Sequence, residues 1–166
     1  MWIFRTDSLR YLTVEVATLI RLTSQLWVLA VLSSGVARDD DAKKELKQFE
    51  GTWTVIEHAH NGRSAPAANL KGHKFVFSGD KLQIVSPVGK PEYQITLDGK
   101  TDPKSIEVAH TDPRDNSGPH LGIYKLEKDQ LTVALDMRVR GSARPEGFEA
   151  KQGSPVMVWV LKREKP

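Results

Sequence analysis

The sequence predicts an all-β fold, an eight-stranded antiparallel up-and-down barrel that follows one short helix. After Gly51, apolar residues recur at every second position in eight short segments, and this alternation is typical of strands with one buried face. Turn residues separate the segments at nearly regular intervals, which indicates a meander closed as a barrel or folded as a sandwich. We favour the barrel because closure leaves no exposed strand edge.

Residues 1–37 differ from the rest of the chain and are predicted to be a signal peptide. Arg5 and Arg10 precede a short apolar run at 26–32, and small residues follow that run, which is the order of a secretory signal. We therefore expect export to the periplasm or the extracellular space, and a mature domain over residues 38–166 that has no membrane span. An uncleaved anchor is the alternative, although the run is shorter than the ~20 apolar residues of a spanning helix.

Composition excludes several classes of protein. The chain has no cysteine, which excludes disulfides and thiolate metal sites. Its 24 Lys and Arg and 21 Asp and Glu give a net charge of +3, and both signs are interspersed along the chain. A nucleic-acid-binding surface needs clustered basic residues, so we expect no nucleic-acid partner.

One helix is predicted, over Asp39–Gln48, before the strands begin. The three consecutive acids at 39–41 are placed to cap its first N–H groups, and Gly51 is a natural stop after its end. The predicted strands are Gly51–His60, His73–Ser78, Lys81–Ser86, Glu92–Leu97, Ser105–His110, Leu121–Leu126, Leu131–Leu135 and Val156–Leu161.

Two long polar stretches interrupt the strands. The first is Asn61–Gly72 and the second is Arg138–Ser154, which contains Pro145 and several glycines. Both are predicted to be loops, and we expect Phe148 to anchor the second one by pointing inward.

The predicted inward face of the barrel is apolar, with two tyrosines that carry polar hydroxyls. Its members are Phe75, Phe77, Leu82, Ile84, Tyr93, Ile95, Leu97, Ile106, Val108, Tyr124, Leu131, Val133 and Leu135. An eight-stranded barrel is either filled by such side chains or holds one small ligand. In the second case Tyr93 and Tyr124 are the best polar contacts for a ligand, whereas in the first they make structural hydrogen bonds.

Gly51-Thr52-Trp53, after a short helix and at the start of the first strand, resembles the Gly-x-Trp signature of lipocalins. The resemblance implies that Trp53 plugs the closed end of the barrel and that an arginine of the last strand, here Arg163, packs over it as a cation–π contact.

The likeness extends over most of residues 38–166, which resemble the exported, uncharacterised lipocalin-like domain family of planctomycete bacteria. Four parts of the chain carry it, namely 41–53, 121–133, 144–154 and 158–165. The family implies a fold and a compartment but no ligand or activity. The chain departs from the family in residues 134–140, where relatives often have a more apolar, cysteine-bearing segment, and Arg138 and Arg140 are expected to make one rim of the barrel distinct.

Metal binding and catalysis find little support in the sequence. His58 and His60 share one face of a strand and are weak metal candidates, with His110 or His120 as a third ligand from another strand. There is no Gly-x-Ser-x-Gly elbow and no glycine-rich phosphate loop after a strand. We therefore expect a noncatalytic protein without a cofactor.

The favoured function is the binding of a small apolar molecule in the mouth of the barrel. The candidate ligand contacts are Phe75, Phe77, Tyr93, Tyr124, His110 and Arg138. The alternative is a filled barrel that acts as a protein-interaction or inhibitor module in the cell envelope. A cavity below the ~300 Å³ of usual ligand sites would favour that alternative.

Overall fold

The computed structural model describes residues 33–112, 114–115 and 117–165, with side chains from residue 41 onward. By its internal contacts the chain divides into two units, Met1–Asp40 and Asp41–Pro166. The predicted signal peptide, residues 1–37, lies almost entirely outside the described residues and stays a prediction. Among the helices of the described part, none is long and apolar enough to cross a membrane.

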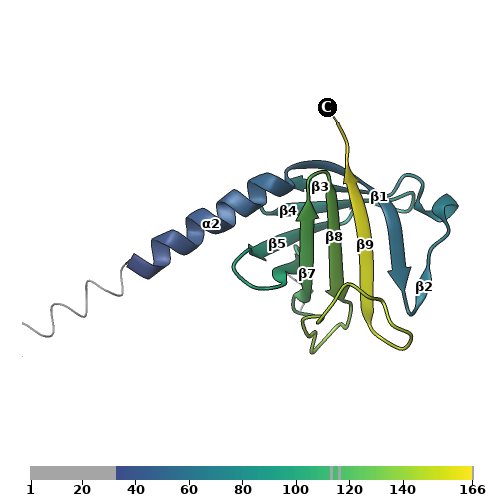
Figure 1. The fold of residues 1–166 in the computed structure, drawn as a ribbon. Helices are drawn as coiled ribbons and strands as arrows, with labels where there is room; N and C mark the ends of the chain where they lie inside the picture. Colours follow the sequence, from purple (N-terminus) through teal and green to yellow (C-terminus); the bar gives the residue numbers. More distant parts are fainter. Residues whose placement is uncertain (1–32, 113, 116, 166) are drawn as a thin grey trace, which may run out of the picture. The chain divides into compact units, whose positions relative to one another are not determined.

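The second unit is a closed eight-stranded antiparallel barrel of the lipocalin-like kind, as the alternation predicted (Figure 1). Each strand pairs with the next one along the chain, and the last strand pairs with the first, which closes the ring. The barrel strands are β1 (Gly51–His60), β3 (Lys74–Ser78), β4 (Lys81–Val85), β5 (Glu92–Asp98), β6 (Lys104–His110), β7 (His120–Glu127), β8 (Gln130–Asp136) and β9 (Val156–Arg163). A two-residue strand, β2 (Arg63–Ser64), pairs only with the end of β1.

The two ends of the barrel differ in their connections. At one end helix α2 (Ser33–Phe49) leads into β1, and two-residue turns join β3 to β4 and β7 to β8. We call this the closed end. The connections at the opposite end are longer, and we call that end the open end. They run over residues 61–73, 86–91, 111–119 and 137–155.

The barrel interior consists of the side chains that alternation predicted. Every member of the predicted inward face belongs to one core cluster, either as a buried residue or, for Ile84 and Tyr93, as a partly buried residue packed against it. The period of two therefore identified the buried face of each of these strands correctly.

The closed end is sealed by aromatic side chains, as the lipocalin resemblance implied. Trp53 is 0% exposed, its Nε1 donates to the carbonyl of Phe49 at 2.7 Å, and the Arg163 guanidinium lies 4.1 Å from the centre of its ring. The guanidinium also donates to the carbonyls of Gln48 and Glu50, where α2 ends and its free carbonyls favour a cation. The Phe49 ring meets those of Phe77 and Tyr124 edge-on, at 5.2 and 5.0 Å, and all three belong to the same core cluster as Trp53.

Two local predictions were wrong. Helix α2 begins at Ser33 rather than Asp39, so the acids at 39–41 lie inside the helix and do not cap its first turn. Phe148 does not point into the barrel. It packs on the outer face of the sheet against a second apolar cluster formed by Ile123, Ala134 and Val158. The long loop therefore covers the outside of the barrel wall, because β7, β8 and β9 carry apolar residues on both faces there.

Candidate functional site

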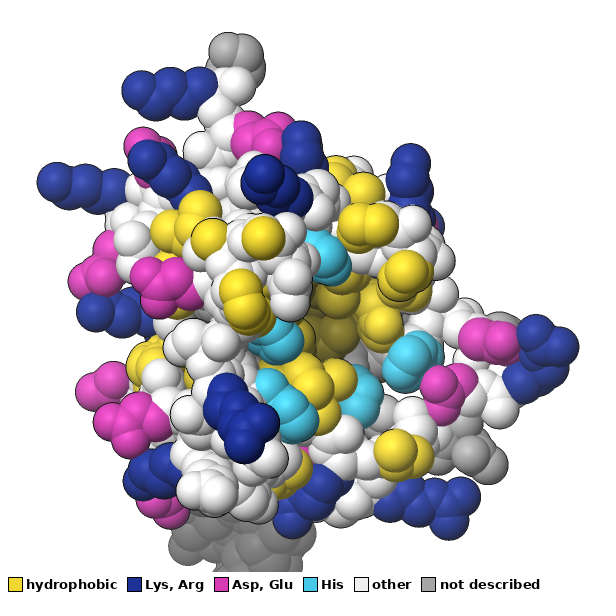
Figure 2. All heavy atoms as spheres, turned by 90° about the vertical axis from the view of Figure 1, so that its right-hand side faces the viewer, with side chains coloured by type: hydrophobic (Ala, Val, Ile, Leu, Met, Phe, Trp, Pro, Cys, Tyr) yellow, Lys and Arg dark blue, Asp and Glu magenta, His cyan; other side chains and the backbone are white. Residues whose placement is uncertain are grey.

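The open end collects all five histidines of the chain. His58 and His60 lie at the end of β1, His73 precedes β3, His110 ends β6 and His120 begins β7. Figure 2 shows histidine side chains gathered around a hollow whose floor is made of hydrophobic side chains. An apolar interior thus reaches the surface through a rim of imidazoles.

An irregularity in β1 brings one of these histidines, His58, to the inner face. Val55 pairs with Leu161, but Glu57 pairs with Val160, so one extra residue of β1 forms a bulge between them. A bulge shifts the alternation by one position. As a result Val55 and His58 both face the interior, whereas strict alternation would place Glu57 there.

A cavity of about 300 Å³ lies beside His58. Its lining is formed by Val55, His58, Ala65, Asn69, Leu70, His73, Phe75, Ile84 and Trp159. Leu70 comes from a short 3₁₀ helix, η1 (Ala67–Leu70), inside the connection predicted to be a polar loop. The volume is at the lower end of the ~300–1,000 Å³ typical of small-molecule sites.

Aromatic rings form one side of this cavity. The His58 imidazole stacks on the Trp159 indole with centres 5.2 Å apart and an angle of 16° between their planes. The Phe75 ring lies 6.0 Å from the same indole at an angle of 51°. These contacts hold the three rings in fixed orientations, which is a condition for a preformed binding site.

Two nitrogen atoms of histidines that line this cavity lack hydrogen-bond partners within the described part of the chain. They are His58 Nε2 and His73 Nδ1, and both are buried. Burial of the ring lowers the pKa of His58, and the nearby His60 and His73 lower it further. The His58 imidazole is therefore neutral at neutral pH.

Another part of the open end holds a second group of rings. The Tyr93 ring lies 4.9 Å from that of His110, and His110 lies 5.9 Å from His120. His110 Nδ1 is 3.5 Å from an Asp115 carboxylate oxygen. Burial raises the pKa of Tyr93, so its hydroxyl stays protonated. None of these four residues lines the 300 Å³ cavity.

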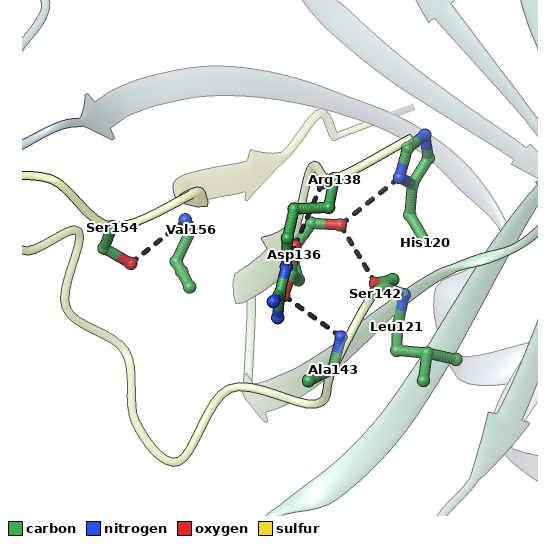
Figure 3. A network of polar contacts seen from close by, with 8 residues as sticks. All are labelled: His120, Leu121, Asp136, Arg138, Ser142, Ala143, Ser154 and Val156. Atoms are coloured by element: carbon green, nitrogen blue, oxygen red, sulfur yellow. Dashed lines mark hydrogen bonds and ion pairs between the residues drawn. The ribbon is translucent and has the colours of Figure 1, made fainter. Parts of the chain in front are cut away.

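Arg138 is held in a polar network at the start of the long loop (Figure 3). The carboxylate of Asp136, which is buried, accepts hydrogen bonds from the guanidinium and backbone N–H of Arg138 and from the N–H of Ala143 at 3.0 Å. These donors, Arg138 first, lower the pKa of Asp136 to about 2.

The backbone of Asp136 extends the same network. Its carbonyl accepts from the hydroxyl of Ser142 at 3.2 Å and lies 3.2 Å from His120 Nδ1. The Ser142 hydroxyl in turn accepts from the N–H of Leu121 at 2.9 Å. The Arg138 side chain thus helps to hold this loop against β7 and β8.

Two further candidate residues lie at the closed end. Phe77 packs against Phe49, and the Tyr124 hydroxyl donates to Glu45 on α2 at 2.8 Å. Burial and the Glu45 carboxylate raise the pKa of Tyr124, so this hydroxyl remains a donor. Lys104 pairs with the same carboxylate at 2.8 Å. The structure therefore brings only Phe75 and the weak metal candidate His58 together in the cavity.

Metal ligation by the predicted histidines has no geometric support in residues 41–165 as described. No group of three or more His, Asp or Glu side chains converges there in a way that could hold a metal ion. His58 instead stacks on Trp159, and His120 faces the carbonyl of Asp136.

Sequence reasoning missed three important cavity residues. Trp159 lies in a strand whose residues are almost all apolar, so alternation could not mark its inner face. Leu70 falls in a segment whose polar composition predicted a loop, and His73 is the first residue of the strand predicted after it. The imidazole at 73, at the start of an alternating strand, was the one available signal.

No protein-family model, curated protein or solved structure matches this chain.

Proposed function

We propose that this protein is a noncatalytic binding protein that takes one small, mainly apolar molecule into the cavity at the open end of its barrel. The observation that carries the proposal is the preformed cavity of about 300 Å³ with an apolar and aromatic lining. Because Trp53 and Phe49 seal the opposite end, a ligand enters and leaves only through the rim of histidines. Membership of the lipocalin-like family and export from the cell belong to the same proposal, and the Trp53–Arg163 stack supports the first.

The cavity also bears on the alternative of a filled interaction or inhibitor module. The filled module is expected to have a cavity below the ~300 Å³ of usual ligand sites. The cavity beside His58 has about 300 Å³ and therefore reaches the lower limit for a ligand site. Two valines, Val88 and Val139, are exposed in open-end connections and are available to a protein partner. They are single side chains on separate loops, whereas a contiguous patch is expected of an interface. We therefore retain ligand binding as the proposed function.

The test uses naphthalene as an apolar probe and the ¹⁵N-labelled full chain. Binding in the cavity should shift the indole N–H resonance of Trp159 and leave that of Trp53 at its unliganded position, since only Trp159 lines the cavity. Ala65→Phe should fill the cavity and abolish the shift. Ala68→Phe is the matched control, because Ala68 is exposed and outside the lining.

Two results would contradict the proposal. One is no shift of Trp159 with naphthalene or with its hydroxylated analogue 2-naphthol up to their solubility limits. The other is equal binding by wild type and by a folded Ala65→Phe variant, which would place the probe elsewhere.

A further inference from the structure

The unpaired nitrogens of His58 and His73 indicate what kind of ligand the cavity accepts. His58 Nε2 and His73 Nδ1 are buried and without a partner in the described residues, and both side chains line the same cavity. Native proteins seldom leave buried polar atoms unpaired, because each costs roughly 1–3 kcal/mol. A ligand that forms hydrogen bonds with these atoms would recover that cost, which a purely apolar ligand cannot do.

Charged ligands do not fit the lining. No Lys, Arg, Asp or Glu is among the residues that form the cavity, and its polar groups are the two imidazoles, the amide of Asn69 and the indole N–H of Trp159. An ionised group transferred into such surroundings loses its hydration without gaining an opposite charge. The lowered pKa of His58 points the same way, since a neutral imidazole offers no counter-charge to a carboxylate.

A hydroxyl group matches the two nitrogens better than a carbonyl group does. Each nitrogen of a neutral imidazole is a donor in one tautomer and an acceptor in the other. A hydroxyl both donates and accepts, so it pairs with either tautomer, whereas a carbonyl pairs only with a nitrogen that carries the proton. The stacked rings of His58 and Trp159, with Phe75 at an angle to them, provide flat apolar surface for the rest of the molecule.

We infer that the cavity selects a small, neutral, hydroxylated aromatic molecule, whose hydroxyl binds His58 Nε2 or His73 Nδ1 while its ring packs beside Trp159. The inference rests on the proposed function and specifies the ligand class of that site. It assigns the histidines at 58 and 73 a role in ligand selection, distinct from the structural contacts that His110 and His120 make at the rim.

The experiment compares three probes of the same ring system, namely naphthalene, 2-naphthol and 2-naphthoate. Their affinities for the full chain are measured at pH 7.5 from the Trp159 indole resonance. One hydrogen bond to a buried unpaired nitrogen should make 2-naphthol bind about tenfold tighter than naphthalene. The anionic 2-naphthoate should bind more weakly than naphthalene.

Variants then identify the atoms responsible. His58→Phe preserves a ring that can stack on Trp159 and removes the nitrogen, and His73→Leu removes the second one. At least one of them should reduce the preference for 2-naphthol to less than about twofold while naphthalene still binds. His110→Phe is the matched control at the rim, outside the cavity, and should keep the tenfold preference.

Several outcomes would overturn the inference. Equal wild-type affinities for naphthalene and 2-naphthol would show that the cavity does not select a hydroxyl group. The proposed function, binding of a small apolar molecule, would still hold. Tighter binding of 2-naphthoate than of 2-naphthol would contradict neutrality. A tenfold preference that survives in the double variant His58→Phe/His73→Leu would exclude both nitrogens. Absence of binding by all three probes would instead contradict the proposed function itself. The wild-type comparison needs no variant, so it decides the matter even if a substitution prevents folding.

Discussion

Replacing Trp53 by alanine should cost about 3–5 kcal/mol of unfolding free energy, the usual range for a buried tryptophan. The structure places this residue toward the upper part of that range for three reasons. Its side chain is 0% exposed, its Nε1 satisfies the Phe49 carbonyl, and its ring face holds the Arg163 guanidinium. Domains of this size are stable by about 5–15 kcal/mol, so the variant should be measurable but much weakened. Urea unfolding of the full chain at 25 °C, followed by far-ultraviolet circular dichroism, gives the value.

Two matched variants separate the contributions at the closed end. Trp53→Phe keeps an aromatic ring but removes the N–H group, and it should cost about 1–2 kcal/mol. Arg163→Met keeps the apolar stem and removes the guanidinium, and its coupling to the Trp53 ring in a double-mutant cycle should be about 0.5–2 kcal/mol. A loss below about 1 kcal/mol for Trp53→Ala, with an unchanged dependence on urea, would show that the indole is exposed in solution. The assignment of the closed end would then be wrong.

Three further predictions test other parts of the barrel. Gly122→Ala should lower the free energy of unfolding in urea by about 1–3 kcal/mol, because its new Cβ would lie 2.4 Å from the Ala134 carbonyl oxygen. Gly89→Ala is the control and should change stability little, since Gly89 has open space around it. Equal stabilities of the two variants would refute the close approach at Gly122. Asp136 has a pKa lowered from 3.8 to about 2, so its contribution, up to about 2 kcal/mol, is present above pH 3.8 and is lost as the pH falls toward 2. The stability difference between wild type and Asp136→Asn should therefore shrink over that interval, and a constant difference would contradict the ion pair. Phe148→Ala should cost about 1–2 kcal/mol and speed proteolysis of the long loop, since it uncovers the outer cluster; unchanged cleavage would show that the loop is held without it.

The sequence allowed the barrel to be predicted because its strands bury one face each, so that composition repeats with the period of the backbone. The Trp53–Arg163 contact could also be predicted, since a recognisable signature marked both residues. The site was harder to predict because it depends on departures from regularity. The bulge after Val55 turns His58 inward, and no residue type in β1 predicts a bulge at that position.

Long-range partners also lay beyond the reach of the sequence. Tyr124 was a ligand candidate because a buried hydroxyl needs a partner, but that partner is Glu45, 79 residues away. Arg138 was a rim candidate, yet it pairs with Asp136, whose carboxylate also accepts from the N–H of Ala143 farther along the loop. Phe148 is apolar in a polar loop, and the sequence cannot tell whether such an anchor points into a barrel or onto its outer wall.

The pairing of β9 with β1 has a consequence for how the molecule is made. The strand that completes the ring is also the last of the eight barrel strands to be synthesised, and it must pair with both β1 and β8. Until then those two neighbours present unpaired edges that can recruit strands of another chain. A product that stops before residue 156 has no means of covering them. Newly made copies are therefore most prone to self-association until β9 has been synthesised and paired.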